Sequence, residues 1–130
     1  MASDYYKPCP ELDKCEALIK AHFETGQYEK CFQGHLELAN NGYPLAECQV
    51  GYFYFDGLGV ENDPAKAFFW TERAAVHGDR DGQYNLAWFY ETGVGCKIDM
   101  EKARYWYREA ALQDHNLAIE KCKKCGISLA

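Results

Sequence analysis

The stretch DGLGVENDPAKAFFW, residues 56–70, resembles a ligand-binding loop, because it has two glycines, three acidic side chains and an Asp-Pro pair. A calcium loop would need acidic residues at alternating positions and a glycine at the sixth. A phosphate loop would end in Gly-Lys-Ser/Thr, and neither pattern occurs here. A second copy, TGVGCKIDMEKARYW, keeps both glycines but lacks Glu61 and Asn62, the polar groups that a ligand would use. We therefore interpret residues 56–70 as a helix end, a tight turn and a helix start.

The sequence CKKC places Cys122 and Cys125 at the spacing of a zinc or redox motif. Zinc would need two further ligands, but Cys9 and Cys15 lie toward the other end of the chain. We therefore predict no metal site, and Cys122 with Cys125 is the alternative ligand pair. A disulfide between these two cysteines, or one involving Cys9 and Cys15, is the corresponding alternative for an oxidising environment.

A catalytic site would need a nucleophile, a base and an orienting group within hydrogen-bonding distance of one another. The only serines, Ser3 and Ser128, are terminal, and no Gly-x-Ser-x-Gly, His-Glu-x-x-His or Walker motif occurs. The four histidines are expected near helix ends or on outward faces: His22, His35, His77 and His115. His77 and His115 are expected at helix C-termini, where a cation is favourable. We predict that the protein is not an enzyme and uses no cofactor.

Composition and charge exclude several other classes of function. The net charge is −6 and no dense cluster of lysine and arginine interrupts it, so we expect no nucleic-acid or membrane partner. Electrostatic steering instead favours a basic partner. No apolar stretch is long enough to span a bilayer and no signal-peptide pattern is seen, so we expect a cytoplasmic protein with reduced thiols.

The elements that position these residues form an internal repeat. Shifting the sequence by 36 residues places residues 53–78 over residues 89–114 with ten identities and no gap. Each copy reads as helix, loop and helix. In the first copy, Gly57 is suited to end a helix near Phe55, Asp63 to cap the next helix and Pro64 to begin it.

The rest of the chain contains partial copies of this unit. We expect an extended arm over residues 1–10, a degenerate helical hairpin over 11–43, two full repeats over 44–79 and 80–115, and a capping helix over 116–130. The hairpin should contain helices near residues 12–24 and 28–40. Because one unit cannot bury its own apolar face, stacked units predict an all-α, right-handed superhelical α/α solenoid.

Four of the seven cysteines align with apolar positions of other units. The aligned sets are Cys122 with Leu86 and Val50, Cys125 with Phe89 and Phe53, Cys96 with Val60, and Cys31 with Ala67 and Ala103. Because a free cysteine behaves as a small hydrophobic residue, we expect these thiols in the core.

The motifs "VGYFYFDGLGVENDPAKAFFWTERAAVHG" and "LAWFYETGVGCKIDMEKARYWYREAALQD" resemble the Sel1-like repeat, a relative of the tetratricopeptide repeat. Three residues depart from its pattern: Ala87 replaces a glycine, Cys96 a loop valine and Asp114 the closing glycine. The resemblance implies an α/α superhelical adaptor that holds partner proteins or peptides, with no catalytic residues. Cysteine-rich members that carry disulfides and have been linked to β-lactamase-like activity are a weaker match, because the cysteines here do not recur at the repeat period.

If the units stack as in tetratricopeptide arrays, the first helix of each unit faces a concave groove. Val50, Phe53 and Tyr54 then point to the core, while a second stripe faces the groove. We expect the groove residues to be Tyr52, Phe55, Asp56, Tyr84, Asn85, Trp88 and Glu91. The alternative is that Tyr52, Phe55, Tyr84 and Trp88 pack against the first helix of the neighbouring unit or against the N-terminal arm.

The sequence therefore predicts a non-catalytic adaptor or scaffold whose groove binds a protein or peptide, basic or amphipathic in character. A second hypothesis is a structural unit without a groove ligand, which self-associates through its terminal helices. A third is the cysteine-rich type, with disulfides and β-lactam-related activity.

Overall fold

The computed structural model describes residues 10–130, with side chains from residue 13 onward; the predicted arm over residues 1–10 therefore lies almost wholly outside the described part. That part contains helices and no strand. The segments are α2 (Pro10–Leu18), η1 (Ile19–Phe23), α3 (Tyr28–Asn40), α4 (Pro44–Asp56), α5 (Pro64–Val76), α6 (Arg80–Thr92), α7 (Met100–Leu112) and α8 (Asn116–Cys125).

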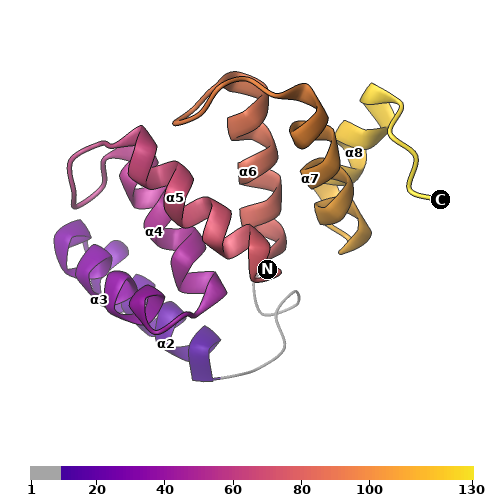
Figure 1. Cartoon of the computed structure of the whole chain (residues 1–130). Helices are drawn as coiled ribbons and strands as arrows, with labels where there is room; N and C mark the ends of the chain where they lie inside the picture. Colours follow the sequence, from indigo (N-terminus) through magenta and orange to yellow (C-terminus); the bar gives the residue numbers. More distant parts are fainter. Residues whose placement is uncertain (1–9) are drawn as a thin grey trace.

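The helices form an all-α solenoid, as the repeat predicts. Figure 1 shows them in a curved row, from α2 and α3 at one end to α7 and α8 at the other. The α4–α5 and α6–α7 hairpins are the two full repeats, and α8 adds the first helix of a further unit. The first helix of each unit, here called the A helix, is α2 with η1, α4, α6 or α8, and the second, the B helix, is α3, α5 or α7.

Local signals in the sequence determine the helix ends. The carboxylate of Asp63 accepts a hydrogen bond from the backbone N–H of Lys66 at 3.1 Å and so caps α5. Asp99 caps α7 in the same way. Gly57 ends α4 in the left-handed conformation, with φ of 71°. The interpretation of residues 56–70 as a helix end, a turn and a helix start is therefore confirmed.

The first A helix differs from the single α-helix expected over residues 12–24. It runs as α2 to Leu18 and then widens into the π-helical turn η1. The backbone N–H of Glu24 donates to the carbonyl of Ile19 at 2.9 Å, five residues back rather than four. Apolar spacing predicts that a helix forms here, but it does not distinguish these two windings.

The core contains the stripe that the repeat predicts. Val50 and Phe53 are fully buried, and so is Leu86 in the second repeat. The small residues that permit close helix packing are also buried: Ala67, Ala74, Ala75, Ala103, Ala110 and Ala111. Trp70, expected to fill the space between helices, is only partly buried.

The second glycine of each loop joins neighbouring units. A Cβ atom added to Gly59 would overlap the backbone carbonyl of Tyr28, the first residue of α3. In the next unit, a Cβ on Gly95 would overlap the carbonyl of Pro64, the first residue of α5. Each loop therefore lies directly on the start of the preceding B helix, where a side chain has no room.

A buried carboxylate links the two helices of the first repeat. The Glu47 side chain is fully buried, and its Oε1 and Oε2 contact His77 Nδ1 at 2.6 Å and Arg73 Nε at 3.2 Å. In the second repeat the equivalent contact is neutral: the Gln113 amide donates to Gln83 Oε1 at 2.8 Å. The same position thus holds a carboxylate–imidazole contact in one repeat and an amide pair in the next.

The expectation for His35 is wrong, because the side chain is fully buried rather than outward or near a helix end. Its Nδ1 lies 2.9 Å from the carbonyl of Cys31, one turn earlier in α3, and its ring packs edge-on against Phe53. Its Nε2 is buried without a hydrogen-bond partner among the described residues. The sequence could not reveal this burial, because the ring is covered by helices from two units.

The buried His35 predicts a dependence of stability on pH. Burial lowers the pKa of His35 below its ordinary value, although the Cys31 carbonyl partly opposes this. Below pH of about 6.5 the unfolded chain binds a proton that the folded chain excludes, so stability falls by up to about 1.4 kcal/mol per pH unit. Above pH of about 6.5, the contribution of His35 to the free energy of unfolding no longer changes with pH. Urea unfolding of wild type and His35→Phe between pH 5 and 7 would measure it, and parallel curves for the two proteins would refute it.

Cys122 and Cys31 are buried, as their alignment with apolar residues predicts. The same expectation is wrong for Cys125, which is exposed. α8 ends at Cys125, whereas α6 continues for three residues past the equivalent Phe89. Burial raises the pKa of the Cys122 thiol.

Asp114 occupies the position of a glycine in a conformation that favours glycine. It follows α7 with φ of 64°, whereas Gly78, its counterpart after α5, has φ of 95°. Because a Cβ atom is unfavourable in this region, Asp114→Gly should raise the free energy of unfolding by about 0.5–1 kcal/mol. Urea unfolding tests this, with Gly78→Asp as the reverse control, expected to lose a similar amount. A destabilised Asp114→Gly protein would contradict the prediction.

Candidate binding groove

A hollow of about 370 Å³ lies where the A helices α4, α6 and α8 meet. Its lining combines aromatic rings with amide, carboxylate and imidazole groups. The lining residues are Cys48, Gln49, Tyr52, Asp81, Tyr84, Asn85, His115 and Leu117.

A second hollow, of about 130 Å³, continues from the first toward the C-terminal ends of α4 and α6. Its lining is mainly aromatic: Tyr52, Phe55, Thr71, Asn85, Trp88 and Phe89. Because Tyr52 and Asn85 line both hollows, the two form one continuous depression along the A helices. We call this depression the groove.

Five of the seven predicted groove residues line it. Tyr52 and Trp88 keep 41% and 37% of their surface exposed. Phe55 is partly buried and meets the Trp88 ring edge-on at 5.5 Å, and Tyr84 stacks on His115 at 4.6 Å. Phe55 and Trp88 thus contact each other across neighbouring A helices, and Tyr84 contacts the cap of α8, as the alternative expects. Tyr52 and Trp88 nevertheless keep open surface.

The other two predicted residues, Asp56 and Glu91, do not line either hollow. Glu91 holds three helices together: its Oε1 accepts from the Tyr107 hydroxyl at 2.6 Å and its Oε2 from Lys121 at 2.9 Å. The bond from Tyr107 lowers the pKa of the Glu91 carboxyl, and Lys121 lowers it further. Asp56 is exposed at the end of α4.

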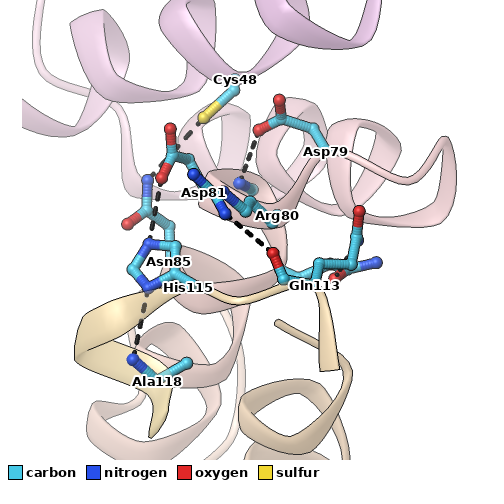
Figure 2. Close-up of polar contacts among 10 residues, drawn as sticks. Cys48, Asp79, Arg80, Asp81, Asn85, Gln113, His115 and Ala118 are labelled. Carbon is cyan, nitrogen blue, oxygen red and sulfur yellow. Dashed lines mark hydrogen bonds and ion pairs between the residues drawn. The ribbon is translucent and has the colours of Figure 1, made fainter. Parts of the chain in front are cut away.

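His115 was expected at the C-terminus of a B helix, but it caps the start of α8 instead. Its Nδ1 accepts from the N–H of Ala118 at 3.2 Å, and its Nε2 donates to Asp81 at 3.0 Å (Figure 2). Both ring nitrogens are therefore occupied, which leaves neither free to act as a base. The 36-residue shift aligns His115 with Asp79, the cap of α6, so the repeat contained the signal that could have placed it.

Cys48 lies at the inner side of the groove, where the Asn85 amide donates to its sulfur at 3.9 Å (Figure 2). Burial raises the pKa of this thiol well above its ordinary value, and the charges of Asp79 and Asp81 raise it further. The thiolate, which is the nucleophilic form, is therefore disfavoured at this position. Asn85 and Gln49 remain as neutral hydrogen-bonding groups along the groove.

The described part of the chain contains no cluster of three or more histidine, cysteine or acidic side chains placed to hold a metal ion. Cys31, Cys48, Cys96, Cys122 and Cys125 are free thiols. The pair in CKKC is divided between a buried Cys122 and an exposed Cys125. Within residues 10–130, no helix has the length and apolar character needed to cross a bilayer.

The fold and groove define this protein as a helical-repeat solenoid with an aromatic depression along its A helices. The Sel1 repeat profile matches residues 44–79 and 80–115, which together are more than half of the chain. The chain belongs to the Sel1 repeat family. Proteins of this family generally act as scaffolds for protein interactions.

Among curated proteins, the chain is 43% identical over 58 residues to a chitin synthase regulator of Saccharomyces cerevisiae, a match covering 45% of this chain and 8% of the yeast protein. Among solved structures, it resembles a Sel1 repeat protein from Oxalobacter formigenes, with TM-score 0.76 and 34% identity over 84% of this chain and 43% of that one. The cysteine-rich protein B of Helicobacter pylori shares the fold, with TM-score 0.74 and 24% identity, covering 98% of this chain and 91% of that one. The chain thus spans less than half of the yeast and Oxalobacter proteins.

Proposed function

We propose that this protein is a non-catalytic adaptor that binds a peptide segment of a partner protein in its A-helix groove. The observation that carries this proposal is the open surface of Tyr52 and Trp88 in a depression that also contains the Asn85 amide. Aromatic rings provide large contact areas at low entropic cost, and the amide can pair with a peptide backbone. The yeast relative is described as a regulator of an enzyme, which is consistent with a binding role.

The proposal is tested with Trp88→Ala, using peptides selected on the wild-type protein from a random-peptide display library. We expect the variant to bind such a peptide at least about tenfold more weakly in fluorescence anisotropy, since exposed aromatic anchors dominate such contacts. Tyr105→Ala is the matched control, because Tyr105 is 55% exposed on the B helix α7. It should bind like wild type.

The stability of Trp88→Ala completes this test. A loss of about 3 kcal/mol or more in unfolding free energy would identify Trp88 as a core residue rather than a contact residue. Equal peptide affinity for Trp88→Ala and wild type, or failure to select any peptide, would contradict the groove as the binding site.

A further inference from the structure

Tyr52 and Trp88 present exposed aromatic surface, 41% and 37% of each residue, in the groove. They come from neighbouring A helices and line the same hollow. Other rings in the molecule already carry a lysine at 5.4–5.6 Å: Tyr54 with Lys66, Tyr90 with Lys102 and Tyr107 with Lys121. Within residues 13–130, no lysine or arginine lies over Tyr52 or Trp88. With respect to residues 13–130, these two rings are open to a cation from a partner.

Asp56 supplies a carboxylate beside this hollow. It lies one helical turn after Tyr52, so the two side chains are on the same face of α4. Burial raises the pKa of the Tyr52 hydroxyl, and the charge of Asp56 raises it further. Among the residues whose side chains the structure describes, none forms an ion pair with Asp56. Glu91, near the end of the next A helix, has Lys121 as its partner.

The helix ends add further negative potential at this place. α4 and α6 end at Asp56 and Thr92, and neither has a basic residue in its last turn. Because a helix C-terminus carries partial negative charge, an acidic residue there is unfavourable without a cation nearby. The 36-residue shift aligns Asp56 with Lys20, which has the favourable sign. Asp56 is thus placed where an external cation would relieve a local repulsion.

We propose that Tyr52 and Trp88 at this end of the groove, together with the Asp56 carboxylate just outside it, bind an arginine or lysine side chain of a basic peptide segment. The inference rests on the proposed peptide-binding function and specifies its partner. The cationic head group lies against the two rings and pairs with the Asp56 carboxylate. The net charge of −6 attracts such a segment from solution.

The test uses the display-selected peptides and two charge-neutralising variants. We expect the selected peptides to contain arginine or lysine, and replacing that residue by glutamine to weaken binding about tenfold. Asp56→Asn should weaken binding of the unchanged peptide by a similar factor of about ten. Its thermal midpoint should equal or exceed that of wild type, since a repulsion at the end of α4 is removed.

Glu61→Gln is the matched control, because it changes the net charge equally. Glu61 is an exposed loop residue beside Tyr54 rather than in the groove. The Glu61→Gln variant should bind the selected peptide with an affinity within about twofold of wild type at physiological salt. Equal effects of the two variants, or selected peptides without cations, would overturn the cation site. If Trp88→Ala weakens binding while Asp56→Asn does not, the cation site falls and the groove remains; if neither does, both proposals fall.

Discussion

Replacing Gly95 by alanine is expected to lower the free energy of unfolding by about 3 kcal/mol. The left-handed conformation of this residue, with φ of 66°, costs about 1–2 kcal/mol when a Cβ is present. The new methyl group would also overlap the backbone carbonyl of Pro64 and approach the Cβ of Phe68. A backbone at the start of a helix cannot rotate away as a side chain can, so overpacking adds about 1–3 kcal/mol.

Gly93→Ala is the matched control for this prediction, because Gly93 lies in the same loop with φ of 80°. A Cβ there would come closest to the side chain of Ile98, at 3.1 Å, and would lie at an ordinary contact distance of 3.6 Å from the backbone carbonyl of Cys96. We therefore expect a loss of only about 1–2 kcal/mol from the conformation itself. Urea unfolding measures the free energy of unfolding of the two variants. Equal decreases would show that the contact between units at Gly95 adds no cost.

Removing the buried carboxylate with Glu47→Ala is expected to destabilise the protein by about 3 kcal/mol. The change leaves a cavity and removes the contacts to His77 and Arg73. Loss of one partner of a buried ion pair costs about 3–5 kcal/mol when the other charge stays buried. The side chains of Arg73 and His77 are 45% and 40% exposed, so water can solvate them again, and the lower end of that range applies.

The second repeat provides the control for Glu47. The double variant Glu47→Gln with His77→Gln copies the pair formed by Gln83 and Gln113. It fills the cavity and restores a hydrogen bond without charge, so we expect it to lie within about 1 kcal/mol of wild type. Unfolding of the single and double variants under the same conditions measures both effects. A Glu47→Ala protein as stable as wild type would refute the proposed role of this carboxylate.

The sequence predicted most of the groove residues, but not those that the α8 segment contributes. Tyr52 and Trp88 are related by the 36-residue period and face the groove because their helices repeat the same pattern of buried residues. His115 and Leu117 line the same hollow from α8, but the partial third copy contains too little of the motif to indicate this. The sequence predicted the same role, a carboxylate in the groove, for Asp56 and Glu91. In the structure Glu91 instead forms an ion pair with Lys121 on α8.

The sequence by itself determined the repeat, the class of fold and the helix ends, because these depend on interactions between residues close in the chain. Asp63 caps α5, which begins at the next residue, and Gly57 terminates α4, whose last residue directly precedes it. Only the tertiary structure decided that His35 and Glu47 are buried, that Cys125 is exposed and that Gly59 lies on the backbone of Tyr28. Each of these outcomes depends on which helix of the same or a neighbouring unit covers the residue, and local periodicity carries no information about that neighbour.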